Sequence, residues 1–105
     1  LGVSLYLSTD SGDEGFKGTT VDFLSTNLKK GGFKSADYFT CGPEPMMKGI
    51  AEIVKTHGCR VQVCLEEKMA CGLGACLSCV KKINGHYLRI CKDGPIFWGD
   101  EVAWA

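Results

Sequence analysis

Four cysteines that lie close together along the C-terminal half of the sequence are its most distinctive chemical feature. Their spacing is Cys71-x4-Cys76-x2-Cys79-x11-Cys91. Thiolates bind zinc and iron–sulfur clusters, and four of them complete the ligand set of either group. These four side chains are therefore predicted to form one metal-binding site.

The spacing favours a [2Fe–2S] cluster used for electron transfer. A C-x4-C-x2-C run followed by a distant fourth cysteine is the plant-type [2Fe–2S] pattern. Zinc sites with four cysteines usually combine two short C-x2-C units, and this sequence contains one. Gly72 and Gly74 would let the backbone bend tightly and turn N–H groups toward the sulfurs. A zinc-stabilised interaction module with four cysteine ligands and a set of unligated thiols are the alternatives.

The composition of the 105-residue chain indicates an ordinary globular protein. Twelve basic and twelve acidic side chains give zero net charge, so no electrostatic argument favours nucleic acid or an anionic membrane as a partner. The apolar stretches are too short to span a bilayer, and no secretion signal is evident, so a cytoplasmic location is expected. The number of cysteines, seven, is odd and counts against a disulfide scaffold, and in a reducing compartment the bunching of four of them points to metal ligation.

Residues 1–58 show the order strand, helix, strand, helix, which is typical of a parallel α/β sheet. Strands are expected over residues 3–7 and 37–40. Thr19 and Asp22 form a capping box at the start of the first helix, which Gly31-Gly32 ends. The second helix is expected to begin at Pro45. Its predicted inward face consists of Met46, Ile50, Ile53, Val54 and His57.

Two strands are too few for a doubly wound sheet. Residues 1–58 are therefore predicted to be the C-terminal half of a nucleotide-binding domain. The missing strands would precede Leu1, where the chain opens without an initiator methionine like the interior of a longer protein.

Residues 59–105 are predicted to form a small β-rich cluster-binding domain. A strand is expected over residues 60–66, and a hairpin over residues 80–83 and 87–90 turns at Asn84-Gly85. Residues 93–99 are turn-rich and aromatic. Cys59 and Cys64 are expected to be buried or half-buried apolar residues.

Three segments of the sequence together resemble one family. They are similar to the C-terminal part of the electron transfer subunit of NAD-dependent dihydroorotate dehydrogenase, within the ferredoxin–NADP reductase superfamily. The cysteine loop with its flanking Met69-Ala70 is the most specific of these segments. The segments are residues 8–18, residues 41–46, and residues 69–79 together with 91–97.

The resemblance implies a path for electrons in pyrimidine biosynthesis. In the family, dihydroorotate is oxidised at FMN in a separate catalytic subunit, with which this type of subunit forms a heterotetramer. Electrons then pass through a [2Fe–2S] cluster to FAD and on to NAD⁺. The FAD-binding barrel and the glycine-rich first loop of the NAD domain have no counterpart in this sequence. The chain alone is therefore expected to be non-catalytic and to bind FAD or NAD poorly.

The resemblance also implies which residues contact NAD. Thr9 and Asp10 would lie beside the adenosine ribose, where an acidic side chain suits the free 2′-hydroxyl of NAD. Cys41-Gly42-Pro43 would lie near the nicotinamide, with Glu44 and Met46 in the same motif.

Sister proteins share this architecture, namely the small subunits of the NADH-dependent ferredoxin–NADP oxidoreductase and sulfide dehydrogenase type. These are expected to carry aspartate at the first cluster ligand, so Cys71 argues against them.

Overall fold

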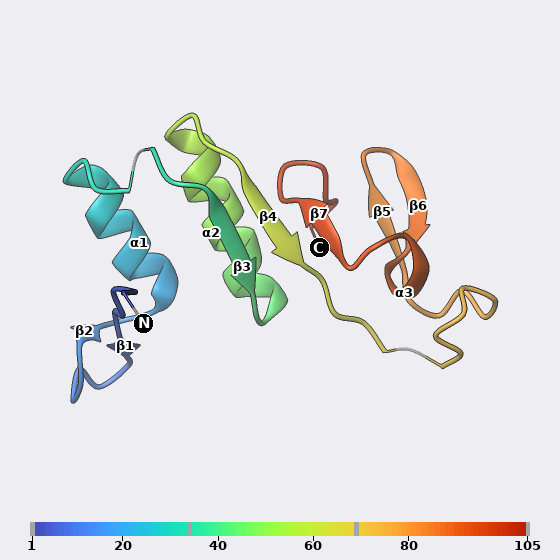
Figure 1. Ribbon diagram of the computed structural model, residues 1–105, viewed down its shortest axis with the longest axis horizontal. Coiled ribbons are helices and arrows are strands. Elements are labelled where there is room, and N and C mark those ends of the chain that lie inside the picture. Colours follow the sequence, from blue (N-terminus) through green and yellow to red (C-terminus); the bar gives the residue numbers. More distant parts are fainter. Residues whose placement is uncertain (1, 34, 69, 105) are drawn as a thin grey trace. The chain divides into compact units, whose positions relative to one another are not determined.

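The computed structural model describes residues 2–33, 35–68 and 70–104, and Met69 of the cysteine-loop motif lies outside them (Figure 1). The chain divides into two compact units, Leu1–Ser35 and Ala36–Ala105. The described part of the chain is mixed α/β and holds three small sheets. None of its helices is long and apolar enough to cross a membrane.

The first unit contains one helix and one pair of very short strands. Strands β1 (Ser8–Thr9) and β2 (Phe16–Lys17) pair in parallel, and helix α1 (Thr20–Lys29) follows. The predicted capping box is confirmed. The amide of Asp22 donates to Thr19 Oγ1 at 3.1 Å, and the amide of Thr19 donates to Asp22 Oδ2 at 3.1 Å.

The strand predicted over residues 3–7 is wrong. The described residues 2–7 have no regular secondary structure, and the side chains of Val3 and Leu5 are 79% and 81% exposed. Alternating apolar residues fit one face of a sheet, but a strand also needs a neighbour for its backbone hydrogen bonds. Pairing with the Phe16 segment begins at the carbonyl of Leu7, which accepts from the Phe16 amide at 2.8 Å.

The second unit is built on a three-stranded sheet. Strand β3 (Tyr38–Cys41) leads through helix α2 (Glu44–Thr56) to β4 (Val61–Cys64), which lies parallel to β3. Strand β7 (Ile96–Trp98) pairs antiparallel with the other side of β4 (Figure 1). The sequence did not indicate β7. The sheet also continues across the predicted boundary near residue 58, and the division into domains 1–58 and 59–105 remains a prediction.

Helix α2 packs against β3 and β4 and supplies much of the core. The expected inward face was partly wrong, because His57 is exposed and Met46 is half-buried. The helix is rotated so that the i, i+3, i+4, i+7 set facing the sheet starts one residue later. That buried set is Met47, Ile50, Ala51 and Val54.

A two-stranded hairpin and one helical turn complete the second unit. Strands β5 (Val80–Ile83) and β6 (His86–Arg89) are antiparallel, and helix α3 (Ile90–Asp93) follows. The predicted turn is confirmed. Asn84 and Gly85 both have positive φ, 50° and 81°, as a two-residue type I′ turn requires.

Candidate functional site

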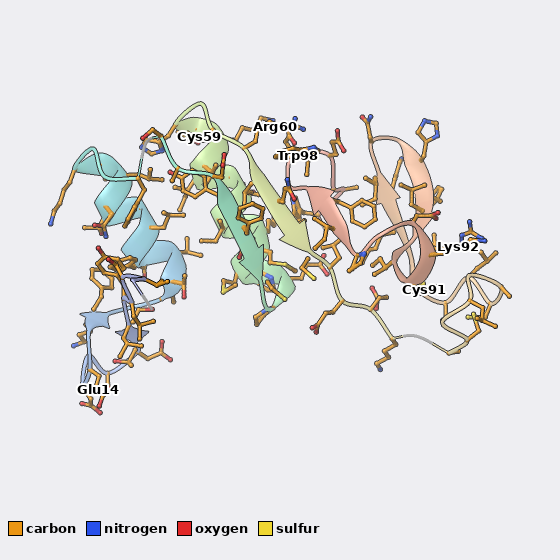
Figure 2. All side chains as sticks on the ribbon, in the orientation of Figure 1. Glu14, Cys59, Arg60, Cys91, Lys92 and Trp98 are labelled. Atoms are coloured by element: carbon orange, nitrogen blue, oxygen red, sulfur yellow. The ribbon has the colours of Figure 1, made fainter. Side chains whose placement is uncertain are left out.

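The four predicted cluster ligands come from two places in the second unit. The loop between β4 and β5 carries Cys71, Cys76 and Cys79. Helix α3 carries Cys91 just after the hairpin (Figure 2). All seven cysteines lie in the described residues, and none of them is part of a disulfide.

Backbone amides converge on the sulfur of Cys71. The N–H groups of Leu73, Ala75 and Cys76 donate to this sulfur at 3.3, 3.4 and 3.4 Å. These bonds, the one from Cys76 first, lower the pKa of Cys71 to about 6. A sulfur that accepts three amides carries negative charge readily, as a cluster ligand must.

Glycines make that turn of the backbone possible. Gly72 and Gly74 have φ values of 67° and 83°, which other residues seldom adopt. At Gly74 space is limiting as well, because an added Cβ would lie 2.9 Å from Lys92 Cδ and 3.1 Å from Arg89 Nη1.

The four thiols form two pairs. Cys71 and Cys76 form the first pair, and the Cys76 side chain contributes to the lowered pKa of Cys71. The hydroxyl of Ser78 contacts Cys76 Sγ at 3.1 Å and is the main cause of the lowered pKa of Cys76, against which the Cys71 thiol acts in the opposite direction. In the other pair the Cys91 amide donates to Cys79 Sγ at 3.5 Å. The hydrogen bond between the two thiols of that pair raises the pKa of Cys91.

Paired thiols fit a binuclear iron–sulfur cluster, in which each iron takes two thiolates. A mononuclear zinc site instead needs its donors round one ion. Within residues 2–33, 35–68 and 70–104 no group of three or more His, Cys, Asp or Glu side chains is close enough to hold a single metal ion.

Arg89 fastens the cysteine loop to the end of the hairpin. Its guanidinium donates from Nη1 to the carbonyl of Gly74 at 3.0 Å and from Nε to Asp93 Oδ2 at 3.2 Å. Its amide also donates to Asp93 Oδ2 at 2.8 Å, and this bond contributes most to lowering the pKa of Asp93. The contact places a cation next to the loop that would hold the negatively charged cluster.

The residues predicted to contact NAD lie in both compact units. Thr9 ends β1, and its hydroxyl accepts from the Gly12 amide at 3.0 Å and donates to the Glu14 carbonyl at 3.2 Å, so it orders the loop that contains the exposed Asp10. In the second unit Cys41 is the last residue of β3, and Gly42 and Pro43 follow it directly. Glu44 and Met46 lie in the first turn of α2. The contacts of these residues with NAD remain predictions.

Sequence reasoning missed Lys81, which links the cysteine loop to that first turn. Its ammonium lies 3.2 Å from Glu44 Oε2 and 3.2 Å from Glu67 Oε2. No local signal pairs Glu44 with Lys81, because they are distant in sequence and meet only through the tertiary fold.

Comparison with protein families identifies the cysteine-rich region. Residues 66–103 match the iron–sulfur cluster binding domain of dihydroorotate dehydrogenase B. The predicted resemblance to electron transfer subunits of that enzyme is thereby confirmed for this region, which contains all four candidate ligands.

Similarity to curated proteins extends over most of the chain. The chain is 44% identical over 98 residues to the probable dihydroorotate dehydrogenase B (NAD(+)) electron transfer subunit of Methanocaldococcus jannaschii. It is 41% identical over 101 residues to the corresponding subunit of Caldanaerobacter subterraneus. These alignments cover 93% and 91% of this chain but only 37% and 39% of the relatives, so the chain spans less than half their length.

A solved structure shows the same fold. A chain from the structure of an NADH-dependent reduced ferredoxin–NADP oxidoreductase, described in connection with flavin-based electron bifurcation, superposes with a TM-score of 0.78 at 30% identity. The superposition covers 94% of this chain and 35% of that one.

Proposed function

We propose that this chain is the cluster-bearing part of an electron transfer subunit of NAD-dependent dihydroorotate dehydrogenase. Its [2Fe–2S] cluster would pass electrons from an FMN-containing catalytic subunit toward FAD and NAD⁺ bound in a longer protein. The observation that carries the proposal is the arrangement of Cys71, Cys76, Cys79 and Cys91 as two thiol pairs, one of which receives converging amides. The family match of the same region supports it.

When bound, the cluster would supply reversible one-electron transfer. The role of the chain's own residues is to hold the ligands and to tune the charge around them. Amides donated to Cys71 disperse negative charge on its sulfur, and Arg89 adds positive charge through its bond to Gly74. Two apolar side chains of the same loop, Leu73 and Leu77, are 78% and 60% exposed. They would give the loop an apolar rim suited to contact with the catalytic subunit.

The residues before the cluster region would contribute to the binding of NAD. Residues 1–58 would form half of a doubly wound NAD-binding domain, and residues 59–105 the cluster domain. Asp10 would accept hydrogen bonds from the adenosine ribose, while Cys41 and the following Gly42-Pro43 would face the nicotinamide. The FAD site and the rest of the NAD site would come from parts of the longer protein outside this sequence.

Anaerobic reconstitution of the chain with iron and sulfide tests the proposal. We expect visible charge-transfer absorption, an EPR signal in the reduced state, and iron and acid-labile sulfide in equal amounts. Cys76→Ser should lose these signals, whereas Cys59→Ser, which changes a cysteine outside the site, should retain them. One zinc per chain with no acid-labile sulfide would instead establish the zinc module.

The structural similarity favours one second candidate, the small subunit of an NADH-dependent ferredoxin–NADP oxidoreductase. Both candidates predict the same cluster, so spectroscopy of this chain does not separate them. The longer protein, combined with its catalytic partner, should accept electrons from dihydroorotate under the first proposal and from reduced ferredoxin under the second.

A further inference from the structure

Two cysteines outside the proposed cluster site meet at the carboxyl ends of neighbouring strands. Cys41 is the last residue of β3 and Cys64 is the last residue of β4. They are direct partners in the parallel register of the two strands. Residues at the same register on adjacent strands present their side chains to the same face of the sheet.

That face is the one that α2 leaves uncovered. Along β4, Val61 and Val63 are buried while Gln62 and Cys64 are only half-buried. Cys41 and Cys64 line a pocket of about 180 Å³ together with Phe39, Gln62 and Ile96 of the same face and with Thr40. Cys41 is exposed, and Cys64 is half-buried behind it, so small molecules can reach the pair.

The spacing suits a covalent bond. Neighbouring strands lie roughly 4.8 Å apart, within the range of about 4.4–6.8 Å that a disulfide requires between Cα atoms. The two side chains are close enough for Cys41 to contribute, after burial, to the raised pKa of Cys64. Little movement of the backbone is therefore needed to join them.

We propose that Cys41 and Cys64 form a reactive dithiol that a low-molecular-weight disulfide oxidises reversibly to a cross-strand disulfide. The thiolate of exposed Cys41 attacks one sulfur of glutathione disulfide and expels one glutathione thiolate. The Cys64 sulfur then attacks the mixed disulfide and expels the second. The protein loses two electrons and two protons, and one glutathione disulfide becomes two glutathione thiols.

The third cysteine outside the cluster site cannot substitute for either partner. Cys59 precedes β4, five residues from Cys64, which at roughly 3.3 Å per residue places it on the order of 15 Å away along the strand. The pKa of the Cys64 thiol is raised, first by burial and then by the neighbouring Cys41. This supports Cys64 as the resolving thiol, which reacts only after Cys41 has been modified.

The test uses the cluster-loaded chain incubated with glutathione disulfide under anaerobic conditions. Free thiols are then alkylated, and the chain is digested with trypsin and analysed by mass spectrometry. The three cysteines fall in separate tryptic peptides, residues 35–48, 56–60 and 61–68. We expect a linked species of peptides 35–48 and 61–68, two hydrogens lighter than their sum, which dithiothreitol removes. It should exceed any link to peptide 56–60 by about tenfold.

Two matched variants sharpen the result. Cys64→Ser should abolish the link and leave Cys41 as a stable mixed disulfide with glutathione, whereas Cys59→Ser should change neither. The urea-unfolded chain should lose the Cys41–Cys64 preference and favour the nearer pair, Cys59 and Cys64, because closing the shorter loop costs less entropy. The proposal is overturned if the folded wild-type chain accumulates only mixed disulfides, if peptide 56–60 provides the main link, or if the folded and unfolded chains give the same pattern.

Discussion

Replacing Lys81 by methionine tests whether its two ion pairs fix the cysteine loop in place. Lys81 lies on β5 just after Cys79, and its side chain is only 22% exposed. Its ammonium is shared by Glu44 at the start of α2 and Glu67 at the start of the loop, at 3.2 Å each. Methionine retains much of the aliphatic stem but leaves the two carboxylates with no cation between them.

The expected loss in free energy of unfolding is about 1–2 kcal/mol at pH 7 and low salt. An exposed ion pair contributes about 0.2–1 kcal/mol, and two such pairs are lost. Partial burial of Lys81 raises this value, while the exposure of the Glu44 side chain, 38%, lowers it. For a chain of this length the loss corresponds to a fall in Tm of about 4–8 °C per kcal/mol. Salt should reduce the difference because it screens the charges.

The pH dependence gives a second signature of the same interaction. A hydrogen bond from Lys81 is the main reason that the pKa of Glu67 is lowered. A carboxyl whose folded pKa is depressed stabilises the fold above its unfolded pKa, near about 4.3, and that contribution is lost as the pH falls through the folded value. Burial alone would lower the pKa of Lys81, but its bonds to both carboxylates reverse this and raise it. The stability that Lys81 supplies is therefore present below its unfolded pKa and is lost as the pH rises through the folded value.

Urea denaturation of Lys81→Met beside Lys82→Met measures the effect. Lys82 is the neighbouring residue on β5, is exposed and lies 6.0 Å from the ring of Tyr87, so its loss should cost little. A Lys81→Met/Glu67→Gln cycle isolates one of the two pairs. The reasoning would be refuted if Lys81→Met and Lys82→Met were equally stable at pH 7 and low salt and lost the same amount of stability in acid.

Three further predictions concern the cluster loop and the core. Cys76→Ser should raise amide hydrogen exchange across residues 70–92 while α2 stays protected, since metal binding provides much of the loop's folding energy; unchanged exchange there contradicts this. Val54→Ala should cost about 2 kcal/mol in urea denaturation, because Val54 is fully buried; a loss under about 0.5 kcal/mol would mean that the core adapts. In the metal-free chain at pH 7, Cys71, with a pKa of about 6, should be alkylated faster than Cys91, whose pKa is raised; equal rates would disprove the difference.

The features that the sequence predicted correctly are those specified within a few residues. The capping box of Thr19 and Asp22 spans one helical turn, and the Asn84-Gly85 turn is defined by two backbone angles. The amides that converge on Cys71 come from residues within five positions of it. Local chemistry determines each of these, whatever the rest of the chain does.

The features that it did not predict depend on partners far away in the chain. Residues 3–7 have the alternation of a strand, but a pattern of side chains carries no information about which backbone, if any, pairs with it. Strand β7 was missed for the converse reason, since its three residues become a strand only because β4 offers an open edge. Helix α2 was predicted correctly, but its buried face depends on the sheet beneath it.

The candidate site depends both on its local sequence and on residues that are distant in the chain. Its ligands are visible in the sequence, but the loop that carries most of them has few buried apolar side chains of its own. Long-range polar contacts hold that loop on both sides, through Arg89 at Gly74 and through Lys81 at Glu67. Such polar contacts tolerate small shifts of the loop better than close packing does. The loop can therefore place the two thiol pairs near the geometry of the cluster, and binding of the cluster would fix that geometry. The metal should therefore contribute more to the order of this loop than either cation does, and the Cys76→Ser exchange pattern should exceed that of Lys81→Met.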